Sequence, residues 1–120
     1  MPVRALRGAT TVERDERDHI SARVRALVEA MFARNHLTAD DAISLVVTAT
    51  ADIHSFHPAT AARACGLAEV PILGAQELAV DGTLPRCIRL LLHVETDRPR
   101  ADIVHVFLED AVQLRPDLVR

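Results

Sequence analysis

The stretch Cys87–Glu95, with the sequence CIRLLLHVE, constrains the fold more than any other part of the chain. In an extended strand, alternate side chains point to opposite faces of the sheet. One face is then wholly apolar and is expected to lie in the core; it consists of Ile88, Leu90, Leu92 and Val94. The other face is mixed and carries Arg89, whose guanidinium stays charged and is costly to strip of water unless an anion meets it. The stretch therefore predicts a long strand with an anion opposite Arg89.

The rest of the chain predicts one long helix and one short helix. Apolar residues three and four apart form a stripe from about Asp15, expected as the N-cap, to Asn35–His36. The stripe consists of Ile20, Val24, Leu27, Val28, Met31 and Phe32. Pro58 is placed to begin a short helix over Ala59–Cys65, which Gly66 closes.

Strands and turns account for most of the remaining sequence. Strands are expected at Val3–Ala9, Ile43–Thr48, Val70–Leu73, Cys87–Glu95 and Ile103–Leu108, with a further short one at Glu77–Val80. Turns are expected at 8–11, 38–41, 81–82 and 114–117. Strands outnumber helices, and the long helix must cover one face of a sheet. The fold class expected is α+β (mixed α/β), a mixed sheet packed against the helices, in a single domain over residues 1–120.

Composition and charge narrow the classes of function. The chain is 49% hydrophobic and 26% charged with a net charge of -3, which argues against a nucleic-acid groove or a membrane-attracted surface. Its 14 basic residues are all arginine, whose planar, permanently charged group suits carboxylates and phosphates. Cys65 and Cys87 are expected to be buried free thiols. With no signal-peptide pattern at the N-terminus, a cytoplasmic location is expected.

Arg89 has two alternative kinds of partner, an internal carboxylate at Glu77 or Glu109, or a bound anion. From the residues alone the internal ion pair is favoured, because structural ion pairs outnumber ligand sites. Three more arginines lie near the expected ends of strands or helices, namely Arg7, Arg63 and Arg115. Four cations in such positions suggest a pocket for a small polyanion.

Other kinds of chemistry have weaker support. His54 and His57 have the H-x-x-H spacing of some zinc ligands, but no third ligand follows at a suitable interval. The glycines fit neither a P-loop nor a dinucleotide fingerprint, and no nucleophile with an adjacent base is visible. No metal or cofactor is therefore expected.

Several stretches, taken in order, resemble one known family. The most specific are RGATTVE at Arg7–Glu13 and LRPDL at Leu114–Leu118. Between them lie Asp52–His54, Pro58–Ala59, Arg63, Val70–Pro71, Gln76–Glu77, Cys87–Arg89 and His105–Glu109. Together they resemble the monofunctional, trimeric chorismate mutases with a pseudo-α/β-barrel, and the likeness extends from Arg4 to Leu118. It implies an isomerase of aromatic amino-acid biosynthesis that converts chorismate to prephenate by an intramolecular Claisen rearrangement, without metal or cofactor.

The resemblance also implies a role for each part of the pocket. Arg89 would face the ether oxygen of chorismate, Arg7 would grip a substrate carboxylate, and Glu77 would hold the ring hydroxyl and orient the cations. Further substrate-binding positions implied are Leu73, Gly74, Ala75, Gln76, Phe107, Arg63, Leu114, Arg115, Phe56, His57, Ala59 and Thr60. In this family each active site lies in a cleft between neighbouring subunits, which implies a homotrimer.

Four positions depart from the family pattern. Phe107 stands in place of a tyrosine, Thr60 of a lysine, His57 of a phenylalanine and Gly74 of a cysteine. The missing hydroxyl at 107 and the missing charge at 60 are expected to weaken substrate affinity. The alternative function is a non-catalytic or regulatory trimer that binds a small carboxylate, or a trimer like the imine-deaminating proteins.

Overall fold

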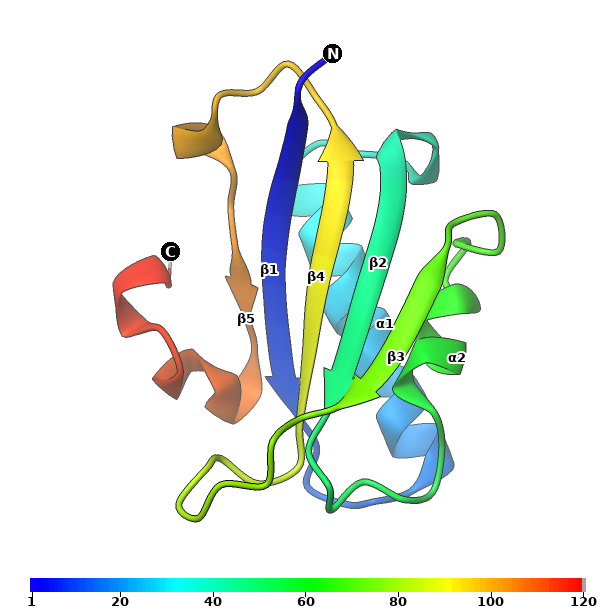
Figure 1. Ribbon diagram of the computed structural model, residues 1–120, viewed down its shortest axis with the longest axis vertical. Helices are drawn as coiled ribbons and strands as arrows, with labels where there is room; N and C mark the ends of the chain where they lie inside the picture. Colours follow the sequence, from blue (N-terminus) through cyan, green and yellow to red (C-terminus); the bar gives the residue numbers. More distant parts are fainter. Residues whose placement is uncertain (120) are drawn as a thin grey trace.

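One mixed sheet of five strands forms the centre of the computed structural model, which describes residues 1–119 and leaves Arg120 outside the described residues (Figure 1). The strands are β1 (Val3–Thr11), β2 (Ala42–Ala49), β3 (Ile72–Gln76), β4 (Cys87–Glu95) and β5 (Val106–Phe107). Their order across the sheet is β3-β2-β4-β1-β5. β4 is antiparallel to both of its neighbours, whereas β3 and β5 run parallel to β2 and β1. The strand that the sequence predicts most clearly is thus the central one.

Both helices pack on the same face of this sheet, which confirms the α+β (mixed α/β) class. α1 (Arg17–Arg34) crosses behind the sheet in Figure 1, and α2 (Pro58–Arg63) packs against β2 and β3. The predicted core face of β4 is buried beneath them, since Ile88, Leu90, Leu92 and Val94 are each 3% exposed or less. The predicted stripe of α1 is buried as well, except that Phe32 is half-buried.

The other face of the sheet is covered only at its β5 edge. There the 3-10 turns Glu109–Gln113 and Pro116–Leu118 fold back, and Ala111 packs with Ala9 and Phe107. Over β2, β3 and β4 no helix of residues 1–119 lies on this side, which we call the open face (Figure 1). Leu73 is 67% exposed and Leu91 is 37% exposed on it.

β1 and α1 approach one another closely at Gly8. A Cβ atom added to Gly8 would lie 2.3 Å from Met31 Sδ and 3.3 Å from a terminal methyl of Leu27. Glycine at this position lets the helix pack closely against the strand. Core packing therefore requires a glycine next to Arg7.

Two expectations about the N-terminal third are wrong. β1 continues to Thr11, which pairs with Cys87, so no turn occurs at 8–11. The turn-like residues there are buried and held by the β4 ladder. α1 begins at Arg17 with Glu16 at its N-cap, and Asp15 is not the cap. The Asp15 carboxylate accepts instead from the backbone N–H groups of His54 and Ser55.

The strand expected at Ile103–Leu108 is shortened to Val106–Phe107 for a clear reason. The Asn35 side chain accepts from the backbone N–H of Val104 at 2.7 Å and donates to its carbonyl at 2.9 Å. An asparagine from the end of α1 thus takes the place of a neighbouring strand.

The remaining elements lie close to their predicted places, with several shifts. The strand expected at Val70–Leu73 is β3, which begins at Ile72 and extends to Gln76, and 77–80 forms no strand. The short helix ends at Arg63, and Gly66 has a φ of +86°. The turn at 38–41 has a capping box, and Gly82 has a φ of +85° in the turn at 81–82.

The cysteines and the helices add two further observations. Cys87 is buried as expected, but Cys65 is only half-buried, and both are free. Among residues 1–119, no helix has the length and apolar character needed to span a membrane.

Candidate active site

One row of paired residues crosses the whole sheet and places Arg89 at its centre. Thr48 pairs with Ala75 on one side and with Arg89 on the other, and Arg89 pairs in turn with Ala9. Ala9 is also the partner of Phe107. Because paired residues in neighbouring strands project on the same side, the row lies on the open face. The order of strands, and not nearness in the sequence, brings these residues together.

Glu77 is the internal anion opposite Arg89, which confirms one of the two carboxylates that the sequence suggests. Arg89 Nε lies 3.0 Å from Glu77 Oε1, with the Arg89 side chain 46% exposed and the Glu77 side chain 24% exposed. The Thr48 hydroxyl donates to the same Oε1 at 2.6 Å, and the Glu77 N–H donates to the Ala49 carbonyl. The other candidate, Glu109, pairs with Arg23 on α1.

A first cavity, of about 550 Å³, lies on the open face around Arg89. It is lined by Arg7, Gly8, Ala9, Val46, Thr48, Arg89, Leu90, Leu91, Phe107, Leu114 and Arg115. Arg7 is placed there by its pairing with Leu91 and by its backbone N–H, which donates to His105 Nδ1 at 2.9 Å. Three guanidinium groups thus converge on a space with an apolar wall, an arrangement that suits a small polyanion.

The C-terminal turns contribute charge to this cavity. Arg115 forms an ion pair with Asp117 at 2.8 Å. The hydrogen bond from Arg115, with a smaller contribution from the charge of Arg7, holds the pKa of the Asp117 carboxyl below its usual range. Asp117 is thus ionised at neutral pH and compensates part of the positive charge at this rim.

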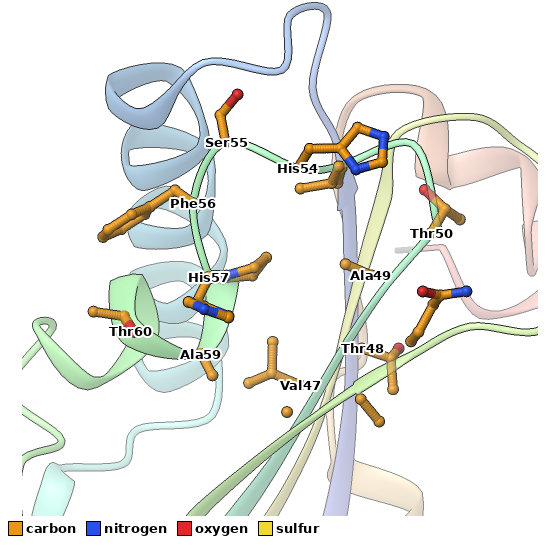
Figure 2. A pocket seen from close by; sticks show the side chains of 15 residues that line it. Val47, Thr48, Ala49, Thr50, His54, Ser55, Phe56, His57, Ala59 and Thr60 are labelled. Atoms are coloured by element: carbon orange, nitrogen blue, oxygen red, sulfur yellow. The ribbon is translucent and has the colours of Figure 1, made fainter.

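A second, larger cavity of about 680 Å³ lies where β2 and β3 end, beside the N-terminus of α2 (Figure 2). It is lined by Val47, Thr48, Ala49, Thr50, Ile53, His54, Ser55, Phe56, His57, Pro58, Ala59, Thr60, Gly74, Ala75 and Gln76. Figure 2 shows His57, Ala59 and Thr60 around its helix side. Its lining includes no arginine, aspartate or glutamate, so it carries no permanent charge. The two cavities therefore differ in electrostatics: the first is cationic and the second is neutral apart from its histidines.

The segment that precedes α1 holds the loop of this second cavity in place. The Asp15 carboxylate accepts from the N–H groups of His54 and Ser55 at 3.0–3.1 Å, and the Ser55 hydroxyl donates to the Asp15 carbonyl at 2.7 Å. The hydrogen bond from the Ser55 N–H is the main reason that the pKa of Asp15 is lowered. Arg17 also stacks on the Phe56 ring, 4.9 Å from its centroid.

Gly74 brings β3 and α2 together on the other side of the second cavity. A Cβ atom added to Gly74 would lie 3.3 Å from Ala59 Cβ, which is tight packing between two small residues. Gly74, Ala75 and Gln76 at the end of β3 line this side of the cavity.

The residues singled out from the sequence fall into two groups in space. Around the first cavity lie Arg7, Arg89, Phe107, Leu114 and Arg115, with Glu77 bonded to Arg89. Around the second lie Phe56, His57, Ala59, Thr60, Gly74, Ala75 and Gln76. Leu73, on the open face, and Arg63, on the exposed side of α2, line neither cavity.

Sequence reasoning missed Thr48, which lines both cavities, and Asp15, which anchors the loop. Thr48 belongs to a correctly predicted strand, but its importance depends on its pairing with Arg89, which no local pattern reveals.

The two histidines of the H-x-x-H spacing, His54 and His57, both line the second cavity. Within residues 1–119, no group of three or more histidine, cysteine, aspartate or glutamate residues has the arrangement of a metal site.

Cys87 lies close to the ion pair at the start of β4. Burial raises the pKa of its thiol, while the charge of Arg89 opposes that effect. The thiol is therefore protonated at neutral pH, and it packs as a small apolar residue beside the guanidinium.

Fixed guanidinium donors beside an apolar wall can bind an anion and stabilise negative charge that develops on a bound oxygen. A carboxylate held against one of them can in addition accept a hydrogen bond from a ligand hydroxyl. The first cavity has such guanidinium groups in its lining, and the Glu77 carboxylate forms an ion pair with one of them, Arg89.

Comparisons with known proteins show which family the chain is similar to. The family model described as Chorismate mutase type I matches residues 3–118. The chain is 43% identical over 119 residues to Chorismate mutase AroH of Bacillus subtilis (strain 168). The matched region covers 98% of this chain and 94% of that protein. It is 44% identical over 117 residues to Chorismate mutase AroH of Thermus thermophilus, covering 97% of this chain and 96% of that protein. Among solved structures, a chorismate mutase from Clostridium thermocellum superposes with a TM-score of 0.86 at 41% identity, covering 89% of this chain and 96% of that one.

Proposed function

This chain belongs to the type I chorismate mutase family, and on that premise we propose that it converts chorismate to prephenate by an intramolecular Claisen rearrangement. The observation that carries the proposal is a cavity lined by Arg7, Arg89 and Arg115, in which Arg89 also forms an ion pair with Glu77. Chorismate is a dicarboxylate with a ring hydroxyl. The arginines of this cavity offer cations for the carboxylates, and the Glu77 carboxylate, paired with Arg89, is the acceptor we assign to the hydroxyl. The protein is accordingly an isomerase of aromatic amino-acid biosynthesis.

The mechanism follows from what the reaction requires. The carbon–oxygen bond of the ether breaks while a carbon–carbon bond forms in the same molecule, so no group is transferred to the protein. The ether oxygen gains electron density in the transition state, and the Arg89 guanidinium is the donor we assign to it. Arg7 binds a carboxylate and helps to hold the substrate in its compact reactive conformer. Glu77 accepts from the ring hydroxyl and keeps Arg89 in place.

We further propose that the protein is a homotrimer whose active sites lie between subunits. The support is the division of the candidate residues between two cavities, one with Arg7 and Arg89 and one with His57 and Thr60. In the proposed cleft, the first cavity of one subunit faces the second cavity of its neighbour. The exposed apolar residues of the open face, such as Leu73 and Leu91, also fit burial between subunits. A cytoplasmic location is proposed as well, supported by two free cysteines.

Loss of chorismate absorbance on addition of the purified protein tests the activity directly. We expect turnover, with prephenate as product, in a buffer that contains a metal chelator. Binding of chorismate without turnover would favour the alternative of a non-catalytic carboxylate-binding trimer. Hydrolysis of an imine substrate without loss of chorismate would favour the imine-deaminase-like alternative.

Mixed oligomers test the placement of the site between subunits. Arg89→Ala disables the first cavity, and Thr60→Trp fills the second. If each active site combines two subunits, the two inactive variants refolded together regain about a quarter of wild-type activity, because random assembly pairs intact halves in that share of clefts. A mixture that stays inactive while forming trimers would contradict the shared site. Light scattering coupled to size exclusion measures the oligomeric state.

A further inference from the structure

Thr48 is bonded to the same oxygen atom that Arg89 contacts. Its hydroxyl donates to Glu77 Oε1 at 2.6 Å, and Arg89 Nε lies 3.0 Å from that atom. Thr48 and Arg89 are also cross-strand partners in the antiparallel ladder between β2 and β4. The three side chains form a compact cluster whose two ends are fixed to neighbouring strands.

The two oxygens of the Glu77 carboxylate have different surroundings in this arrangement. Oε1 accepts a hydrogen bond from the Thr48 hydroxyl and forms the ion pair with Arg89, so both of its partners are internal. Oε2 has no hydrogen-bond donor in the part of the chain that the structure describes. A ligand hydroxyl therefore finds its acceptor at Oε2, while Oε1 keeps the carboxylate from rotating.

The backbone of Glu77 alone does not provide this restraint. Glu77 is the first residue after β3, at the beginning of a loop in which Leu78 is 83% exposed and Val80 is 58% exposed. Its N–H is bonded to Ala49, but the side chain has rotatable bonds beyond that anchor. Thr48 lies on β2, which is paired on both sides with β3 and β4, and its β-branched side chain has limited rotamer freedom, so it is a rigid donor.

We propose that Thr48 is a positioning residue of the active site, acting through Glu77. Its hydroxyl holds Oε1 against Arg89, which directs Oε2 at the substrate hydroxyl and the remaining guanidinium N–H groups at the ether oxygen. The inference rests on the proposed function for its substrate, but the geometry it invokes belongs to the protein alone. Thr48 itself is not a catalytic residue, because its only bonded partner in this cluster is the carboxylate.

Two substitutions at this position separate the hydroxyl from the packing. Thr48→Val keeps the shape of the side chain and removes its hydrogen-bond donor. We expect kcat to fall about tenfold, because a hydrogen bond to a charged group is lost, and we expect KM to change less. Thr48→Ser keeps the donor and is expected to retain wild-type kcat within about threefold. In a Glu77→Ala background, Thr48→Val is expected to have no further effect, because the group through which it acts is absent.

Nitrogen NMR of the Arg89 side chain gives a measurement that does not depend on activity. We expect the Arg89 Nε–H signal, assigned with Arg89→Ala, to exchange faster with solvent in Thr48→Val and to be unchanged in Thr48→Ser. The proposal would be overturned if Thr48→Val had the wild-type kcat and the wild-type rate of Arg89 Nε–H exchange. It would also be overturned if Thr48→Val lowered kcat by the same factor in the Glu77→Ala background as in the wild-type protein. Wild-type protein that leaves chorismate intact would overturn the proposed function instead, and the exchange measurement would still decide the role of Thr48.

Discussion

Ala9 is the backbone partner of both Arg89 and Phe107, so a single small residue separates the central guanidinium from the aromatic ring at the sheet edge. Neighbouring strands lie about 4.8 Å apart, which places the Cα atoms of Arg89 and Phe107 roughly 10 Å from each other. Ala9 is 1% exposed and has only a methyl group. Ala9 is thus the small residue in the lining of the first cavity between Arg89 and Phe107.

Substitution of Arg89 by alanine is expected to lower kcat by about 10²–10³, because a donor to the developing charge on the ether oxygen is lost. Its side chain is 46% exposed, so the fold is expected to survive the change. Chorismate turnover and circular dichroism check the two parts. Arg14→Ala is a matched control, since Arg14 lies in an exposed ion pair with Glu16. Wild-type turnover in Arg89→Ala would remove Arg89 from the mechanism.

Substitution of Phe107 by tyrosine is expected to lower KM or leave it unchanged. Phe107 is 9% exposed and packs with Ala9 and Ala111 beside the arginines of the first cavity. A tyrosine hydroxyl there can donate to a substrate carboxylate. Steady-state kinetics on the two proteins decide the matter. A large rise in KM would mean that the ring edge does not point toward the substrate.

Asp15 is expected to make the loop of the second cavity sensitive to acid. The pKa of Asp15 is lowered in the folded protein, chiefly by the hydrogen bond from the Ser55 N–H. The stabilisation is therefore complete above the ordinary pKa of 3.8 and is lost as the pH falls through the lower value of the folded state. Amide chemical shifts of His54 and Ser55 followed below pH 4 report the loss. In the Asp15→Asn variant the amide shifts of His54 and Ser55 are expected not to change with pH in this range. The control is Asp18→Asn, on the exposed first turn of α1, in which these shifts are expected to change with pH as in the wild-type protein.

Gly8 is expected to tolerate alanine poorly. The added methyl meets Met31 Sδ at 2.3 Å, and overpacking of a core typically costs about 1–3 kcal/mol of unfolding free energy. Urea denaturation measures the cost. A double-mutant cycle with Met31→Ala tests the cause, since the penalty of Gly8→Ala is expected to shrink once the methionine is removed. Equal penalties in both backgrounds would place the strain elsewhere.

The parts of the fold predicted correctly are those that local periodicity determines. β4 and its core face follow from alternation, and the stripe of α1 follows from helical spacing, because each element must bury one face whatever it packs against. The expectation at 103–108 failed because Asn35, far away in the sequence, satisfies the backbone of Val104. The expected N-cap at Asp15 failed because its carboxylate is engaged by a distant loop.

The candidate site shows the same limit. A lone arginine in an apolar strand predicted an anion, and Glu77 is that anion. Thr48 was not predicted in this way, because threonine is common in strands. Only the strand pairing, which places it beside Arg89, distinguishes this threonine from others. The division of the candidate residues between two cavities also depends on strand order, which periodicity does not determine.

Substitution of Thr60 by lysine is expected to strengthen substrate binding. Thr60 lines the second cavity, which carries no permanent charge, and Figure 2 shows it on the helix side of that space. A lysine there adds an attractive field for a dicarboxylate, so KM is expected to fall several-fold at low ionic strength and less at high salt, where the field is screened. Thr60→Gln, of similar reach but neutral, is expected to leave KM unchanged, and Thr60→Glu to raise it. An equal effect of lysine and glutamine, or an effect that salt does not weaken, would show that charge at this position does not act on the substrate.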